Sequence, residues 1–365
     1  MEYSKSLDES SSRVPVLLSL IISISVPMIA ALRIIATGYR PTDDALRHVA
    51  KVFSGKPWSE ILVLKPIAEI ESHAGWDAVL TFFQSFTQCS KDGLLSFAVV
   101  SLFCLVTIVP FFLAKRSESW LMILLIMAAL APMTVSRFMI GRPFLITATV
   151  LLVICFSWKK LSDKHFHPGW FIAVTLCITL SVWLHGSWYL FALPLGCFVL
   201  ARKWKGTFRL GIAIFIGVVL GLIMTGHPLA SLEYSLYLVF NSPDQTILSR
   251  MLVGELQPRN VRNIFLILIG GLLLVRYLRG RWTRECVDNP VFILVVCGYV
   301  LGFFIGRFWL DWGLLALMAW VAFELDDLFE SNLEFTDNRR LAVVIPAAIA
   351  FFVISTTDLG SRWTS

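Results

Sequence analysis

The sequence predicts an all-α polytopic membrane protein with about eleven transmembrane helices. Apolar residues make up 57% of the 365 residues and charged residues only 15%, whereas about 25% of the residues in a soluble domain are charged. The apolar residues form continuous runs rather than the alternating pattern of a membrane barrel. Because only helices and closed barrels satisfy their backbone in lipid, each run is predicted to be a membrane-spanning helix. This composition excludes a soluble enzyme, a disordered chain and a collagen-like repeat.

The first predicted span, residues 14–36, follows a polar, serine-rich start and is too long and too poorly bounded for a cleaved signal peptide. Ten further apolar runs follow it. Several are shorter than the roughly 20 residues that cross the hydrocarbon, so their ends are expected to extend into the flanking residues. These spans are predicted at about residues 93–114, 119–135, 143–158, 169–185, 188–201, 210–225, 263–279, 290–306, 308–325 and 341–356.

The orientation of the chain follows from the basic residues of its short connections. With the N-terminus inside, 17 Lys and Arg residues fall on the cytoplasmic side, against 4 in the short outer connections and the C-terminal tail. The net charge of +6 then reflects cytoplasmic loops rather than binding to nucleic acid. We therefore expect an integral protein of the bacterial inner membrane, with residues 1–13 in the cytoplasm and the C-terminus outside.

Two long connections, residues 38–92 and 226–262, are predicted to lie outside. The first is expected to contain interfacial helices, because apolar side chains recur at helical spacing with basic side chains opposite them. One apolar stripe consists of Ala45, Leu46, Val49, Ala50 and Phe53, with Arg47, His48 and Lys51 on the other face, and a second stripe consists of Trp76, Val79, Leu80, Phe83 and Phe86.

An acidic pair, Asp43 and Asp44, follows Thr42 just after the first span, on the predicted outer face. Carboxylates are costly to place near a membrane without a role. One of them could deprotonate an acceptor hydroxyl while the other orients it, and the pair could bind a divalent metal such as magnesium or manganese. The alternative is helix capping, because Thr42 is a good N-cap and acids in the first turn suit the helix dipole.

Basic side chains near the outer face are candidates for binding a donor phosphate. Arg137 and Arg142 lie in a short outer turn, and Arg47 lies on the basic face of the first interfacial helix. A guanidinium group can bind two phosphate oxygens at once. The alternative is that these side chains only extend to lipid headgroups.

Three further residues are candidates for binding an acceptor or a sugar. His185 ends the fifth predicted span, and Trp309 and Asp311 follow Arg307 at an outer turn. Aromatic rings beside a carboxylate suit a sugar. The alternatives are a histidine that favours a helix C-terminus, a tryptophan of the interfacial aromatic belt, and an ion pair between Arg307 and Asp311.

The arrangement resembles the GT-C superfamily of integral-membrane glycosyltransferases. The similarity rests on an N-in first helix, a long first outer loop with interfacial helices, and the acidic pair Asp43-Asp44 at the start of that loop. The resemblance implies that Asp43 or Asp44 is the catalytic base and that Arg142 lies near the donor phosphate. It also implies a core of about seven transmembrane helices over residues 14–225, followed by the outer loop 226–262 and by C-terminal transmembrane helices within 263–365.

The function that this resemblance implies is transfer of a sugar from a polyprenyl-phosphate-linked donor to an acceptor hydroxyl outside the cell, in the assembly of an envelope polysaccharide or glycolipid. Its expected partners are membrane lipids, the donor, and a glycan, lipid or protein acceptor. A transporter or flippase and a non-catalytic subunit of a glycan-assembly complex are the alternatives. Transporters usually carry ionisable groups near the bilayer midplane and often have repeated halves. Here the charges gather at the outer rim and no repeat is visible, which favours the enzyme.

Overall fold

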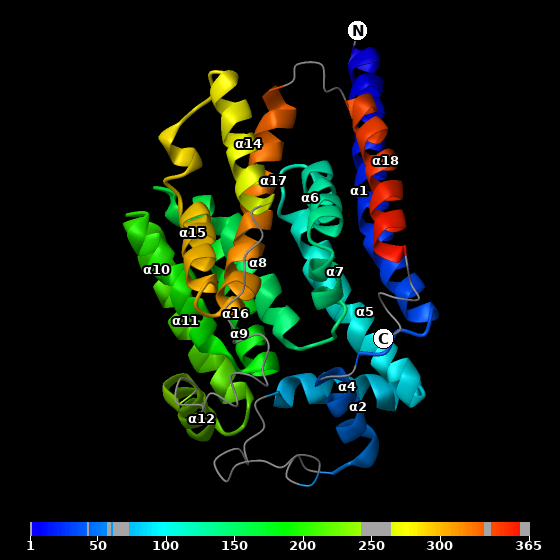
Figure 1. The fold of residues 1–365 in the computed structure, drawn as a ribbon, viewed down its shortest axis with the longest axis vertical. Coiled ribbons are helices and arrows are strands. Elements are labelled where there is room, and N and C mark those ends of the chain that lie inside the picture. Colours follow the sequence, from blue (N-terminus) through cyan, green and yellow to red (C-terminus); the bar gives the residue numbers. More distant parts are fainter. Residues whose placement is uncertain are drawn as a thin grey trace. The chain divides into compact units, whose positions relative to one another are not determined.

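The computed structural model confirms the predicted all-α class. It describes residues 2–41, 44–56, 60, 73–241, 264–331 and 337–357, and these ranges contain helices and connections but no strand (Figure 1). The chain divides into two compact units. The first unit contains residues 1–46, 92–145 and 321–365, and the second contains residues 47–91 and 146–320.

Seven helices in the described ranges are long and apolar enough to cross a membrane, and all seven match predicted spans. They are Val14–Ala36, Lys91–Phe112, Phe144–Ser162, Pro168–His185, Trp204–Met224, Gly306–Glu330 and Arg339–Thr356. The other four predicted spans are helical but shorter: Ser117–Leu130, Trp188–Leu200, Ile264–Leu278 and Pro290–Gly302. At 1.5 Å per residue the longest of these covers only about 22 Å of a hydrocarbon core about 30 Å thick. The predicted count of eleven is therefore not confirmed.

The first unit is built around three helices. Its elements are α1 (Glu2–Ala36), α5 (Lys91–Ile108), η2 (Val109–Phe112), α6 (Ser117–Leu130), α7 (Met133–Phe138) and α18 (Asp337–Thr356). Helices α1 and α18 run side by side, and both contact α6 (Figure 1). Nε of Arg340 on α18 lies 2.5 Å from Oε1 of the buried Glu118 on α6. Such a pair is costly to break, because removing one partner leaves the other charge buried.

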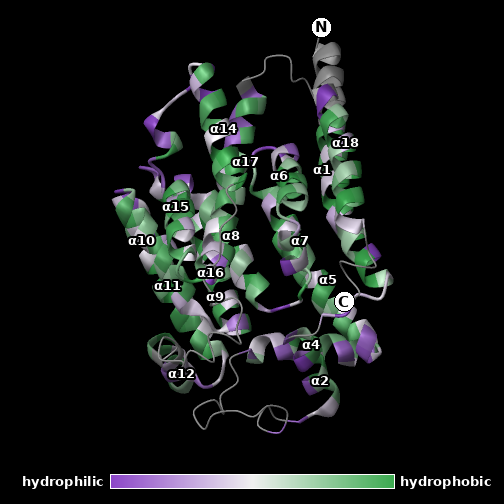
Figure 2. Ribbon diagram, in the orientation of Figure 1, coloured by the Kyte–Doolittle hydropathy of each residue, from purple (hydrophilic) through white to green (hydrophobic). Residues whose placement is uncertain are grey.

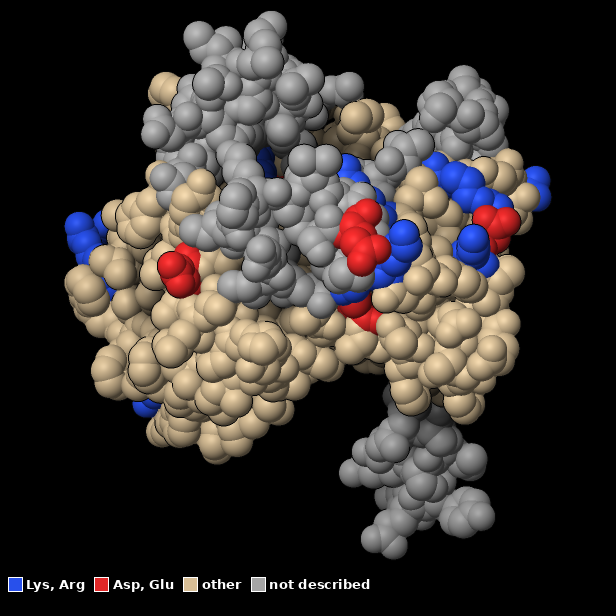
Figure 3. All heavy atoms as spheres, turned by 90° about the horizontal axis from the view of Figure 1, so that it is seen from below, with Lys and Arg blue, Asp and Glu red and all other residues tan. Residues whose placement is uncertain are grey.

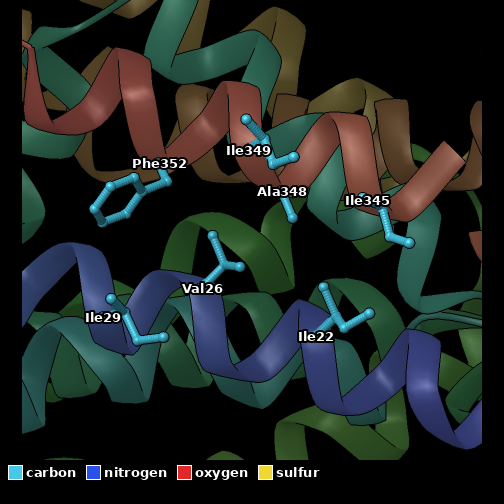
Figure 4. A pocket seen from close by; sticks show the side chains of 7 residues that line it. All are labelled: Ile22, Val26, Ile29, Ile345, Ala348, Ile349 and Phe352. Atoms are coloured by element: carbon cyan, nitrogen blue, oxygen red, sulfur yellow. The ribbon is translucent and has the colours of Figure 1, made fainter.

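An apolar groove of about 360 Å³ runs between α1 and α18 in the first unit (Figure 4). It is lined by Ile22, Val26, Ile29, Ile345, Ala348, Ile349 and Phe352. Half of the accessible surface of Ile29 and more than half of that of Ile349 is exposed. Exposed aliphatic side chains in a continuous patch are typical of a surface that meets lipid or another apolar partner.

The second unit contains most of the remaining helices, and four helices (α2, α5, α8 and α17) have residues in both units. Its elements are α2 (Asp44–Ser54), α4 (Ala74–Thr87), α8 (Phe144–Ser162), α9 (Pro168–His185), η3 (Trp188–Phe191), α10 (Ala192–Leu200), α11 (Trp204–Met224), α12 (Pro228–Asn241), α14 (Ile264–Leu278), η6 (Arg284–Cys286), α15 (Pro290–Gly302), α16 (Gly306–Phe308), η7 (Trp309–Gly313) and α17 (Leu314–Ser331).

Helices α9 and α11 pack closely because α11 carries two glycines four residues apart. A Cβ atom added to Gly217 would lie 2.7 Å from Cγ2 of Ile178, and one added to Gly221 would lie 2.6 Å from Cβ of Val182. Small residues at this spacing let two helix backbones approach, as they do in membrane helix pairs. The pair α9–α11 therefore has the packing expected inside a membrane.

Apolar residues cover the outward sides of the long helices as well as their packed sides. On α9, Ile172, Leu176 and Leu180 recur every four residues and are all exposed. Figure 2 shows hydrophobic residues along the long helices and hydrophilic residues mainly at helix ends and connections. A water-soluble fold would not leave such long apolar stripes uncovered, so the architecture fits a membrane-embedded protein.

The interfacial helices predicted for residues 38–92 exist as α2 and α4, but the predicted faces need correction. On α2, Ala45 and Val49 are buried as expected, whereas Leu46 is exposed. His48, expected on the basic face of the helix, is buried. The buried side of α2 is therefore centred on Ala45, His48 and Val49, which lie three and four residues apart.

Candidate functional site

The structure brings together one member of the predicted acidic pair and one of the predicted phosphate ligands. Asp44 begins α2, and its Oδ2 lies 3.6 Å from Nε of Arg142 within the first unit. About a third of the Asp44 side chain and a quarter of the Arg142 side chain are exposed. Asp43 and Thr42 lie outside the described residues. Asp44 and Arg142, called the outer pair below, therefore form a partly exposed charged contact.

A glycine turn places Arg142 beside α2. Gly141 has a φ of +71°, a conformation that side chains other than glycine rarely adopt. A Cβ atom at this position would lie 2.9 Å from Cγ2 of Val99 on α5 and 3.0 Å from Cβ of Ala45 on α2. Gly141 thus allows the turn before α8 to pack against both helices, and the next residue is Arg142.

The other two predicted phosphate ligands have different surroundings. Arg137 lies in the last turn of α7, with its guanidinium carbon 5.7 Å from the centre of the Phe144 ring. Arg47 lies on α2 and is exposed. On the face of the molecule drawn in Figure 3, acidic and basic residues lie next to one another within a surface that is otherwise mostly uncharged.

The second unit contains a buried polar cluster that the sequence did not predict. Asp77, in the first turn of α4, has one carboxylate oxygen 2.5 Å from Nδ1 of His48 and the other 2.9 Å from Nζ of Lys51. His48 is only 2% exposed, and Asp77 is also buried. His48 and Lys51 lie three residues apart on one side of α2, so both can reach the same carboxylate.

Two more histidines extend this cluster. The ring of His73, which immediately precedes α4, lies 5.3 Å from that of His48 and 5.5 Å from that of His185, measured between ring centres. His185 ends α9 and is buried, with Nδ1 2.8 Å from Oγ1 of Thr147 on α8. Oγ1 of Thr147 in turn lies 2.8 Å from Oγ of Ser181. We call His48, Lys51, His73, Asp77 and His185 the histidine cluster.

Burial and charge together set the protonation of the histidine cluster. Burial alone would raise the pKa of Asp77, but the hydrogen bonds and positive charges of His48 and Lys51 outweigh burial and lower that pKa. The pKa of His73 is lowered to about 3, first by burial and then by the charge of His48, while Asp77 acts in the opposite direction. Near neutral pH, Asp77 is therefore a carboxylate and His73 is a neutral imidazole.

The three residues predicted to bind an acceptor or a sugar are all buried in the structure, each with different neighbours. His185 belongs to the histidine cluster. Asp311 is fully buried, and its Oδ2 accepts a hydrogen bond of 2.8 Å from Nε of Arg307, which confirms the ion pair considered for these two residues. Trp309 is buried, and its ring packs on Phe265 and Tyr299 with ring centres 5.2 and 5.8 Å apart.

No group of three or more His, Cys, Asp or Glu side chains in the described ranges is arranged to hold a metal ion. The predicted metal-binding pair includes Asp43, which is outside those ranges, so metal binding there stays a prediction. No protein-family model matches this chain, and no curated protein matches it.

Proposed function

We propose that the chain is a membrane glycosyltransferase that moves a sugar from a polyprenyl-phosphate donor to an acceptor hydroxyl on the extracytoplasmic side. The observation that carries this proposal is the outer pair, in which Asp44 and Arg142 meet although they come from distant parts of the chain. The Asp44 carboxylate can accept a proton, and the Arg142 guanidinium can bind an anion. The product would be a glycan or glycolipid of the cell envelope.

The outer pair supplies the two electrostatic functions that this reaction needs. Asp44 takes the proton of the acceptor hydroxyl, and the acceptor oxygen then bonds to the anomeric carbon. The bond from that carbon to the donor phosphate breaks, and the prenyl phosphate leaves with the electron pair. Arg142 offsets the negative charge that builds on the phosphate. The planar guanidinium of Arg142 suits the two oxygens of a phosphate.

The membrane architecture supports a lipid-linked donor. Seven candidate spans and an apolar groove on the first unit offer surfaces that suit a prenyl chain. We further propose that the four shorter helices, together with their flanking connections, complete eleven passes through the bacterial inner membrane. The N-terminus is then cytoplasmic, and the outer pair faces the extracytoplasmic side.

The test of this function compares two donor classes in purified, lipid-reconstituted protein. A sugar linked to a polyprenyl phosphate and the same sugar linked to a nucleotide are each supplied with a mixture of envelope glycan acceptors. We expect transfer from the prenyl-linked sugar alone. Transfer from the nucleotide sugar alone contradicts the proposal, because that donor class belongs to the cytoplasm.

A proton-coupled transporter is the second candidate, and the histidine cluster is the observation that favours it. Buried ionisable groups in membrane proteins often mark ion or proton paths. His185 lies at the very end of its span rather than in the middle. Proton flux into liposomes that rises with an added solute, without any glycosyl transfer, would favour the transporter over the enzyme.

A further inference from the structure

The histidine cluster contains an acid–histidine dyad whose geometry fixes how the imidazole is protonated. Asp77 is a carboxylate, so the atom that faces it at 2.5 Å, Nδ1 of His48, must carry a hydrogen. A neutral imidazole holds one hydrogen, and its other nitrogen is an acceptor. Asp77 therefore selects the Nδ1–H form of His48, in the same way that a carboxylate orients the histidine of a catalytic triad.

Lys51 determines the charge of this dyad. Its ammonium group lies 2.9 Å from the second oxygen of Asp77 and already balances the charge of the carboxylate. When Nε2 of His48 gains a proton, the imidazolium that forms is stabilised by that carboxylate. The dyad is thus arranged to accept a proton rather than only to neutralise a charge.

His73 stands between this acceptor and His185. Two imidazoles joined by a hydrogen bond of about 3 Å have ring centres roughly 5 Å apart, since each nitrogen is about 1.1 Å from its ring centre. The observed separations are 5.3 Å for His48 and His73, whose rings meet edge to face, and 5.5 Å for His73 and His185, whose rings are tilted, so His73 contacts both rings. His73 is held neutral at ordinary pH, so it can take a proton on one nitrogen while it gives one from the other.

The surroundings of the cluster come from five elements, one of which is α8, with Thr147 beside His185. Helix α2 contributes His48 and Lys51, α4 contributes Asp77, and α9 contributes His185. Arg307 of α16 acts electrostatically on His185 and is itself paired with Asp311. His48 and His185 are buried, whereas His73 is only partly buried, so His73 is the member through which protons can enter.

We propose that the histidine cluster is a proton-exchange site of the second unit, in which His73 relays a proton from a water or ligand hydroxyl to Nε2 of His48. The O–H bond of the donor breaks, one nitrogen of His73 gains that proton, and its other nitrogen gives a proton to His48. Asp77 is the positioning residue. Thr147 engages Nδ1 of His185 at the other end of the cluster. The site does not depend on the outer pair or on glycosyl transfer.

The test is ¹⁵N nuclear magnetic resonance of the histidine side chains in lipid nanodiscs, with each of the six histidines assigned by substitution. We expect His48 in the Nδ1–H form, with a strongly deshielded Nδ1 proton. Asp77→Asn should move a large part of the His48 population to the Nε2–H form, because an amide can donate a hydrogen bond to Nδ1. A predominant Nε2–H form of His48 in the unchanged protein would overturn the dyad.

The relay is tested by the exchange of the His48 imidazole hydrogen with water. His73→Phe should slow this exchange at least about tenfold, since a phenyl ring cannot pass a proton. His73→Gln keeps a polar side chain and serves where the Phe variant does not fold, and His227→Phe, at an exposed histidine outside the cluster, is the matched control. Unchanged exchange in folded His73 variants would contradict the relay whether or not the protein transfers sugar.

Discussion

Asp44 and Arg142 show how much of the candidate site can be predicted from single residues. The acidic pair and the outer arginine could be recognised in the sequence because charged groups are costly next to a membrane. Their contact could not be predicted, because it depends on how the turn at Gly141 packs against Ala45 and Val99. The sequence suggests candidates for a charged site, and the packing of small residues decides which of them meet.

Replacing Arg142 tests its part in donor binding. Arg142→Lys keeps the charge and loses the planar fork that binds two phosphate oxygens. We expect the KM for the prenyl-linked donor to rise about tenfold, a change of about 1.4 kcal/mol, with a smaller change in kcat. Arg40→Lys is the matched control, because Arg40 also pairs with an aspartate, Asp92, in the same unit. An equal effect of both substitutions would contradict a specific role for Arg142.

His48 shows where residue-level prediction failed. The sequence places it among basic neighbours on α2, and this pattern indicates a solvent-facing side chain. In the structure His48 is buried against Asp77, which lies 29 residues further along the chain. The intervals between Asp44, His48 and Lys51 are four and three residues, so these side chains leave α2 on one side. The spacing indicates that these side chains share one face of α2, but it does not identify Asp77 as the partner of that face.

The lowered pKa of His73 predicts acid sensitivity. The folded protein keeps His73 neutral down to about pH 3, whereas an unfolded chain protonates it near its ordinary pKa of 6.5. Stability is therefore fully present above about pH 6.5 and falls as the pH drops toward 3, by at most about 1.4 kcal/mol per pH unit. Asp77, with its lowered pKa, acts in the same direction.

We expect His73→Gln to flatten this loss of stability on the acid side. The measurement is the midpoint of thermal unfolding in detergent across a series of pH values. His227→Gln should leave the slope unchanged. A His73→Gln variant whose midpoint falls with pH as steeply as that of the unchanged protein would show that His73 is not the cause.

At the scale of elements, helix positions were predictable and helix lengths were not. Long apolar runs identified every helix in the described ranges that can cross a membrane. Four other runs form helices of only 13 to 15 residues, and one of them, Trp188–Leu200, begins only after the turn at Gly186, whose φ is +75°. The hydropathy of a run does not encode where its backbone changes direction.

The close contact of α9 and α11 can be tested by adding one methyl group. In Gly221→Ala the new Cβ would lie 2.6 Å from Cβ of Val182 and 2.8 Å from the backbone oxygen of Thr179, so the helices must separate. We expect a loss of about 1–3 kcal/mol of stability. Gly211→Ala on the same helix has only ordinary contacts, the nearest at 3.9 Å, and should be neutral or slightly stabilising. Equal midpoints of thermal unfolding for the two variants would refute this packing.

At the scale of the whole molecule, the orientation in the membrane rests on the distribution of basic residues. Cysteine substitutions in a cysteine-free background test it with an impermeant thiol reagent added to intact cells. We expect Asp92→Cys to be labelled from outside, since the Asp92 side chain is 73% exposed. Lys160→Cys, at the predicted cytoplasmic end of α8, should not be labelled until the membrane is permeabilised. The reverse pattern would invert the topology and move the outer pair to the cytoplasm.

The most direct test of the central claim is transfer of a prenyl-linked sugar by Asp44→Asn in reconstituted membranes. Asparagine caps a helix about as well as aspartate, so the variant should fold and keep its thermal stability. We expect its turnover to fall by about 10²–10⁴, the usual effect of losing a general base. Asp92→Asn, at an exposed carboxylate of the same unit, should keep its activity. Full turnover by Asp44→Asn would contradict the assignment of Asp44 as the base.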